Sequence, residues 1–249
     1  MKRFDNKTVL VTGGSSGIGL ATAQAYANEG ARVVITGRDA ATLQQAAAVI
    51  GASTIVIRND AGSLQAARDL AKTLAEQHIK LDAVFINAGM AKFAAFSDVT
   101  EDLWDATFNT NVKGAYFQLQ ALSPLLNNGA SIILNGSINA RIGMPNSSVY
   151  AASKAALISL AKTLSAELLP RGIRVNVVSP GPVHTPIYGK LGFDAPTLET
   201  VAAQIQSQIP LGRFGKPEEI AATVLHLSLP ESGFIVGTEI IADGGMSQL

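Results

Sequence analysis

The chain has 249 residues, of which 47% are hydrophobic and 15% charged, and its 19 basic and 19 acidic side chains cancel. This balance gives no bulk electrostatic attraction to nucleic acid or to an anionic membrane. The lack of cysteine excludes a disulfide framework and a thiolate nucleophile. The apolar run near the N-terminus is too short for a signal peptide, and none approaches the ~18–20 residues of a membrane helix. We therefore expect a cytoplasmic protein with no membrane or nucleic-acid partner.

The predicted elements, in chain order, alternate between short apolar strands and longer helices. We expect strands within residues 7–13, 32–37, 53–58, 81–89, 130–137, 173–181 and 238–245. We expect helices over residues 15–30, 39–49, 63–77, 101–126, 148–169 and 198–207. Strands rich in valine and isoleucine that alternate with helices are typical of a parallel sheet covered by helices on both faces. The sequence therefore predicts one α/β domain, residues 1–249, built on a doubly wound sheet.

Residues 182 to about 215 depart from this alternation because they are rich in proline and glycine. A long excursion from a compact αβ repeat is usually functional. We expect this stretch to form a lid over the substrate.

The glycine-rich stretch "VTGGSSGIGLA" follows the first strand directly and opens the first helix. Gly13, Gly17 and Gly19 let the backbone approach a pyrophosphate, and the helix start directs free N–H groups at it. Because the motif lies between a strand and a helix at the start of a βα series, it predicts a dinucleotide site.

The end of the second strand, "ITGRD", indicates which dinucleotide is preferred. A carboxylate there would favour NAD, whereas an arginine accommodates the 2′-phosphate of NADP. This strand ends in Thr36 and Gly37, and Arg38 follows. Asp39 comes next, but the N-cap of the following helix explains it without a ligand. We therefore expect NADP(H) to be preferred over NAD(H).

Further short motifs follow in order along the chain. They are Asp60 after the third strand, "NAG" at 87–89, "NVKG" at 111–114, Ser137, "YAASK" at 150–154, "PG" at 180–181 with Thr185, and "DGG" at 243–245. With the glycine turn, they make the sequence similar to the short-chain dehydrogenase/reductase family, in its short single-domain branch, over essentially the whole chain. Ile86 and Ala61 replace an asparagine and a valine that the family often has, and affect only details of the adenine pocket.

This resemblance implies a seven-stranded Rossmann-type sheet, NAD(P)-dependent oxidoreduction of an alcohol/carbonyl pair, and a homotetramer. The helices that hold Asn111 and Tyr150 carry many apolar residues, among them Trp104, Phe108, Tyr116 and Phe117, and we expect these helices to pack against a second copy. We expect coenzyme contacts from Gly13, Ser15, Ser16, Gly17, Ile18, Gly19, Arg38, Asp60, Asn87, Ala88, Gly89, Asn111, Tyr150, Lys154, Pro180, Gly181, Val183 and Thr185.

Tyr150 and Lys154 stand four residues apart, on one face of a predicted helix. A ketone that receives hydride also needs a proton, and a free phenol, with its pKa near ~10, exchanges protons poorly at neutral pH. A lysine one turn away would lower that pKa. Tyr150 is thus the expected general acid/base. The resemblance adds that Ser137, thirteen residues earlier, polarises the substrate oxygen, that Lys154 also binds the nicotinamide ribose, and that Asn111 holds a water in a proton path.

Together these residues predict an NADPH-dependent carbonyl reductase, or an alcohol dehydrogenase acting in reverse. A 3-oxoacyl-thioester reductase shares every motif and stays an alternative, and a non-catalytic dinucleotide sensor is a second. Substrate contacts are expected from Ser137, Met144, Tyr188, Leu191 and Phe193 by location alone. The three histidines share no metal-binding spacing, so no metal site is expected.

Overall fold

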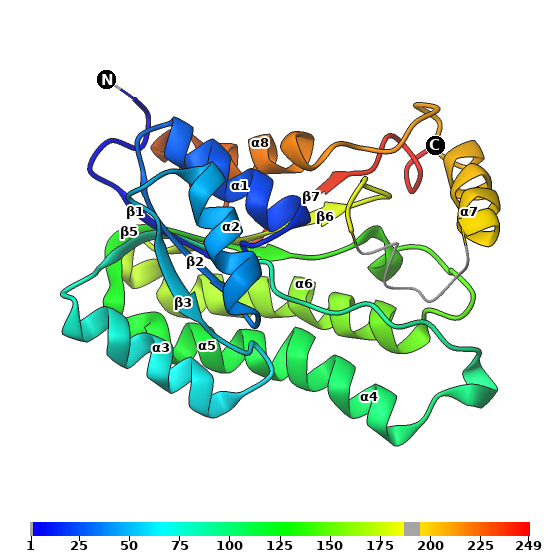
Figure 1. Ribbon diagram of the computed structural model, residues 1–249, viewed down its shortest axis with the longest axis horizontal. Helices are drawn as coiled ribbons and strands as arrows, with labels where there is room; N and C mark the ends of the chain where they lie inside the picture. The colour runs from blue at the N-terminus through cyan, green and yellow to red at the C-terminus, as the bar shows by residue number, and fades with distance from the viewer. Residues whose placement is uncertain (1, 187–194) are drawn as a thin grey trace.

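The computed structural model describes residues 2–186 and 195–249 and contains a seven-stranded parallel sheet (Figure 1). The strands are β1 (Thr8–Thr12), β2 (Arg32–Gly37), β3 (Ile55–Arg58), β4 (Leu81–Ile86), β5 (Leu126–Asn135), β6 (Arg174–Pro180) and β7 (Glu239–Ala242). Their spatial order is β3-β2-β1-β4-β5-β6-β7. The predicted strands and the doubly wound α/β class are confirmed.

Most of the predicted helices are also confirmed. The helices are α1 (Gly17–Asn28), α2 (Ala40–Ile50), α3 (Leu64–Glu76), α4 (Glu101–Phe108), α5 (Ala115–Leu122), α6 (Ser148–Leu168), α7 (Ala195–Ser207) and α8 (Pro217–Ser228). A π-helical turn, Asn109–Gly114, joins α4 to α5. Short 3₁₀ turns lie at Phe96–Asp98, Ser123–Leu125, Ile138–Ala140, Leu169–Arg171 and Pro230–Ser232. Across the described ranges, no helix is both long and apolar enough to pass through a bilayer.

Helix α8 is absent from the sequence prediction. It begins at Pro217, where a proline costs nothing because the first helical N–H has no intrahelical partner. The Glu219 carboxylate accepts the Lys216 N–H at 2.7 Å and closes the first turn. Pro217 and Glu219 directly follow the proline-rich stretch. In the sequence, the start of the helix is therefore hard to distinguish from the loop before it.

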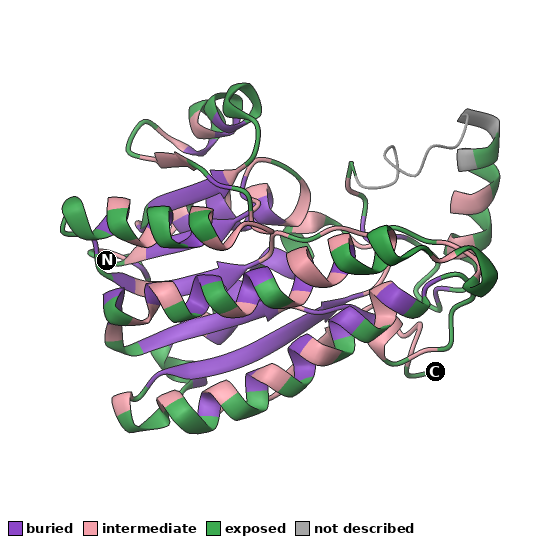
Figure 2. Ribbon diagram, turned by 90° about the horizontal axis from the view of Figure 1, so that it is seen from below, coloured by how far each residue is buried: buried purple, intermediate pink, exposed green. Residues whose placement is uncertain are grey.

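Helices cover both faces of the sheet (Figures 1 and 2). Alternate strand residues contribute to two hydrophobic cores. Val9, Val11 and Ile35 point into the core under α1, α2 and α8. Leu10 and Val34 point the other way, into the core under α3, α5 and α6. The buried strands lie between helices whose outer surfaces are exposed (Figure 2). This two-sided burial explains the nearly continuous apolar strand sequences.

The position of the functional cleft follows from the strand order. β1 pairs with β2 on one side and with β4 on the other. The helix after β1 covers one face, while the helices after β4 cover the opposite face. Where connections diverge in this way, a crevice opens at the carboxyl ends of the strands and receives the ligand. The glycine turn, Asp60, "NAG", Ser137, "PG" and "DGG" each lie at or just after one of these strand ends, whereas "NVKG" and "YAASK" lie in helical segments.

Candidate active site

The glycine turn after β1 has a backbone that only glycine can supply. Gly13 and Gly17 have φ values of +64° and +54°, a region that disfavours side chains. A Cβ atom on Gly19 would lie 2.2 Å from the Gly13 carbonyl oxygen. Within the described chain, the Ser16 side chain makes no capping hydrogen bond to α1. The first N–H groups of the helix are thus left to bind an anion.

The segment after β6 folds over this turn. A Cβ atom on Gly17 would lie 3.3 Å from the Thr185 side chain, so the two chain segments are in contact. Pro180, Gly181, Val183 and Thr185 line one cleft together with Ile18 at the start of α1. The structure thus brings the predicted "PG" motif and the glycine turn into one site.

Two arginines lie at the rim beyond β2. Gly37 pairs with Arg58 of β3, and the Arg58 Nε donates to the Arg38 carbonyl oxygen at 2.9 Å. Both arginine side chains are exposed. Arg58 was not among the predicted residues, because only the strand register reveals that it is adjacent to Arg38.

The acidic residues at this rim are used locally. The Asp39 carboxylate accepts the Thr42 N–H at 2.8 Å, which confirms the predicted N-cap. This hydrogen bond is the largest cause that lowers the pKa of Asp39. Asp60, two residues after β3, accepts the Gly62 N–H at 3.0 Å and so orders the next turn.

The "NAG" motif ties the end of β4 to the glycine turn. The N–H groups of Asn87 and Ala88 both donate to the Thr12 hydroxyl at 2.9 Å. The Asn87 side-chain amide donates to the Thr12 carbonyl at 2.9 Å and to the Gly13 carbonyl at 3.2 Å. A Cβ atom on Gly89 would lie 3.1 Å from Asn111 Oδ1 and 3.6 Å from Lys154 Nζ. The motif therefore borders both the turn and the lysine.

Tyr150 and Lys154 extend from the first turns of α6 toward the end of β5. The Lys154 Nζ donates to the Asn135 carbonyl at 2.7 Å and lies 5.7 Å from the centre of the Tyr150 ring. Lys154 is 5% exposed, and this burial lowers its pKa to about 8.

The pKa of Tyr150 departs from the sequence expectation. Burial raises the pKa of the phenol above its ordinary value, and the hydrogen bond with Ser137 acts in the opposite direction. The lowering that we expected from Lys154 is not found, since its ammonium is held at the Asn135 carbonyl and not at the phenol oxygen. The protein's own groups thus keep Tyr150 protonated at neutral pH.

Ser137 lies two residues after the end of β5 and precedes a short 3₁₀ turn. Its hydroxyl accepts the Asn139 N–H at 3.2 Å. Two residues later, the Arg141 guanidinium forms an ion pair with Glu239 of β7, through Nε at 2.8 Å. The other Glu239 oxygen accepts the Ser179 hydroxyl at 2.6 Å. This network attaches the serine turn to the sheet.

Asn111 lies in the π-helical turn, and its side chain connects three elements. Its Nδ2 donates to the Met90 carbonyl at 2.9 Å and to the Ser153 hydroxyl at 3.0 Å. Its Oδ1 accepts the Met90 N–H at 2.8 Å. The side chain is therefore already engaged with protein groups, and a water in a proton path would have to bind the main chain of this turn.

The cleft in front of Ser137 and Tyr150 has a volume of about 390 Å³. Met144, one of the predicted substrate contacts, lines it. Phe93 packs edge-on against Tyr150 with ring centres 5.6 Å apart, while Val201 and Ile205 of α7 add an apolar wall. Sequence patterning missed these last three residues, since their spacing carries no motif. The predicted contacts Tyr188, Leu191 and Phe193 lie outside the described residues.

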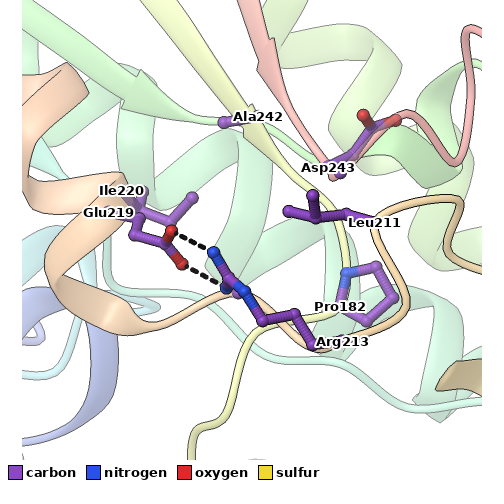
Figure 3. Close-up of a pocket in the computed structure, with 9 residues that line it drawn as sticks. Pro182, Leu211, Arg213, Glu219, Ile220, Ala242 and Asp243 are labelled. Carbon is purple, nitrogen blue, oxygen red and sulfur yellow. Dashed lines mark hydrogen bonds and ion pairs between the residues drawn. The ribbon is translucent and has the colours of Figure 1, made fainter.

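A second, smaller pocket of about 170 Å³ lies at the end of β7 (Figure 3). Arg213 and Glu219 both line it and are joined by a two-pronged ion pair at 2.7 and 2.8 Å. Leu211 also donates its N–H to the Gly244 carbonyl at 3.1 Å. This pocket marks the place where the far end of the 182–215 stretch is fixed to the sheet.

Comparisons place the chain among known proteins. A family model described as enoyl-(acyl carrier protein) reductase matches residues 13–247. An uncharacterised oxidoreductase of Methylorubrum extorquens is 37% identical, over 99% of this chain and 100% of the relative. A 3-oxoacyl-(acyl-carrier-protein) reductase of Thermotoga maritima is 35% identical, over 98% and 99%. The crystal structure of a short chain dehydrogenase from Burkholderia cenocepacia in complex with NADP has a TM-score of 0.89 at 36% identity, over 98% and 99%.

The lowered pKa of Lys154 predicts how the stability of the protein depends on pH. Because the pKa falls from 10.5 unfolded to about 8 folded, the unfolded chain binds more protons between these values, so the free energy of unfolding should rise with pH across this window. The rise should approach about 3 kcal/mol. Urea unfolding from pH 7 to pH 10, without coenzyme, should show it in wild type relative to Lys154→Met. Parallel profiles for the two proteins would contradict the assignment.

Proposed function

The chain belongs to the short-chain dehydrogenase/reductase family, and from this premise we propose that it is an NADP(H)-dependent oxidoreductase that reduces a ketone or aldehyde to an alcohol, or catalyses the reverse. The observation that carries the proposal is the grouping of a protonated phenol, a buried ammonium and a serine hydroxyl at one end of a glycine-lined cleft. Tyr150, Lys154 and Ser137 supply these groups.

The residues present fit a dinucleotide. A Cβ atom on Gly19 would collide with the Gly13 carbonyl oxygen, so glycine at this position lets the turn pack tightly against the start of α1, as a pyrophosphate-binding turn requires. The N–H groups at the start of α1 would hold the phosphates, and Arg38 with Arg58 would hold a 2′-phosphate. Lys154 would bind the ribose next to the nicotinamide. When bound, the coenzyme supplies or accepts the hydride.

The protein's own part in the reaction is proton transfer and orientation. The Ser137 hydroxyl donates to the carbonyl oxygen of the substrate and positions it beside Tyr150. The raised pKa keeps the Tyr150 phenol protonated at neutral pH. The phenol donates that proton to the substrate oxygen as negative charge develops there. Lys154 would hold the ribose of the coenzyme beside the phenolate that remains, and a water at the main chain of the Asn111 turn returns the proton.

Two classes of substrate are candidates. The apolar wall formed by Phe93, Val201 and Ile205 suits a hydrophobic ketone. A 3-oxoacyl thioester is the alternative, favoured by the Thermotoga relative. Both place their carbonyl oxygen between Ser137 and Tyr150. Initial rates with simple ketones and with 3-oxoacyl thioesters, each with NADPH, distinguish them. A non-catalytic dinucleotide sensor would oxidise NADPH with neither.

Two further features of the protein are part of the proposal. We propose that the stretch 182–215, of which 187–194 lie outside the described residues, closes over the substrate, since Val201 and Ile205 line the cleft. We also propose a homotetramer. Trp104, 46% exposed, stacks on Phe108 with ring centres 4.7 Å apart, and Phe117 is also exposed. A second copy would cover these rings.

Replacing Tyr150 by phenylalanine tests the proton donor. The change removes only the hydroxyl, so kcat should fall by about 10²–10⁴-fold while the Kd for NADPH stays the same. The matched control is Tyr116→Phe on α5, away from the cleft, which should keep its turnover. Steady-state rates and coenzyme fluorescence titrations measure both quantities. If Tyr150→Phe kept a tenth of the wild-type kcat, the general-acid assignment would be wrong.

The coenzyme preference can be inverted at the end of β2. We expect wild type to prefer NADPH by about tenfold to a hundredfold in kcat/KM, because Arg38 pairs with the 2′-phosphate at a solvent-exposed rim. Gly37→Asp with Arg38→Leu should favour NADH, since the carboxylate repels that phosphate. A Cβ atom on Gly37 would lie 3.3 Å from the Leu43 and Ser15 side chains, so Gly37→Ala controls for crowding. A wild type that prefers NADH would refute the role of Arg38.

A further inference from the structure

One buried polar atom near the active site has no partner. Across the described residues, Asn135 Oδ1 is the buried side-chain oxygen or nitrogen that makes no hydrogen bond. Asn135 ends β5, two residues before Ser137, and lines the large cleft. Buried acceptors in folded proteins nearly always have a donor, so an orphan here calls for a specific explanation.

The orientation of this amide is fixed by its neighbours. Asn87 uses its Nδ2 to donate to the carbonyls of Thr12 and Gly13. Only its Oδ1 is therefore left to face Asn135, and this oxygen accepts the Asn135 Nδ2 at 2.9 Å. Turning the Asn135 amide over would place two oxygens in contact. The Asn135 Oδ1 must consequently point away from Asn87.

The nearby lysine is directed at the backbone of the same residue. The Lys154 Nζ donates at 2.7 Å to the main-chain oxygen of Asn135, so the side-chain oxygen is a second acceptor at the same strand end. Gly136, Ser137 and Tyr150 line the cleft beside it. A donor from a molecule held between these residues would satisfy the orphan.

We propose that Asn135 Oδ1 accepts a hydrogen bond from the nicotinamide riboside half of the coenzyme, through a ribose hydroxyl or the carboxamide N–H. The inference rests on the proposed function, since it needs a dinucleotide in the cleft. It makes Asn135 a coenzyme-binding residue. Its orientation is set, through Asn87, by the same Thr12 and Gly13 carbonyls that shape the glycine turn.

Calorimetric titration of Asn135→Leu tests this without any turnover. Leucine has nearly the shape of asparagine but no acceptor, so the donor of the ligand would be buried unpaired. The Kd for NADP⁺ should rise by about tenfold to a hundredfold. The Kd for 2′,5′-ADP, which lacks the nicotinamide riboside, should change by less than about twofold. Asn127→Leu, at the opposite end of β5, is the matched control and should bind both ligands as wild type does.

A third ligand distinguishes the two possible donors. 2′-Phospho-ADP-ribose keeps the ribose hydroxyls and lacks the carboxamide. Its affinity should fall in Asn135→Leu if a ribose hydroxyl is the donor, and should be unchanged if the carboxamide is. Either result supports the proposal, provided that NADP⁺ binding is weakened.

Several outcomes would overturn it. Unchanged NADP⁺ affinity in a folded Asn135→Leu protein would show that the oxygen does not meet the coenzyme. An equal loss for 2′,5′-ADP would show a general disturbance of the glycine turn through Asn87. Should the leucine variant not fold, Asn135→Ala gives the same test with a smaller side chain. A wild type that binds 2′,5′-ADP and NADP⁺ not at all would overturn the proposed function itself.

Discussion

A buried ammonium group requires an oxygen partner, because removing its charge from water costs several kcal/mol. In this protein Lys154 finds that partner in the Asn135 carbonyl at the end of β5, at 2.7 Å. The bond holds α6 in one rotation against the sheet. On the same helix, one turn earlier, Tyr150 is thereby held at the cleft. Ser153 lies between them and accepts from Asn111 at 3.0 Å, which attaches the π-helical turn to α6.

Side-chain amides extend this arrangement across three neighbouring strands. Thr12 ends β1, Asn87 follows β4, and Asn135 ends β5, and hydrogen bonds of 2.9 Å connect each to the next. The glycine turn and the lysine therefore cannot move independently. A coenzyme that spans the cleft needs just such a fixed separation between its pyrophosphate and its reactive ring, because hydride transfer depends on close positioning of the reacting atoms.

The parts of this structure that depend on local order along the chain can be predicted from the sequence. Buried parallel strands appear in the sequence as runs of valine and isoleucine, and Asp39 is recognisable as an N-cap. Gly13, Gly17 and Gly19 lie where a tight turn requires them. Arg58, Phe93 and Asn135 could not be found in this way, since strand register and loop packing bring them to the site. Helical spacing places Lys154 beside Tyr150, yet it cannot show that the ammonium bonds to the sheet. This explains the wrong direction expected for the tyrosine pKa.

In the proposed reaction, the coenzyme delivers hydride to a carbonyl whose oxygen is protonated by the protein. The most direct test uses NADPH that carries deuterium at the transferred position of the nicotinamide, with a panel of ketones and 3-oxoacyl thioesters. Mass spectrometry of the product should find one deuterium on the carbinol carbon and none on carbons that the solvent exchanges. Coenzyme that binds and is never oxidised by any member of the panel, or product without the label, would contradict the account.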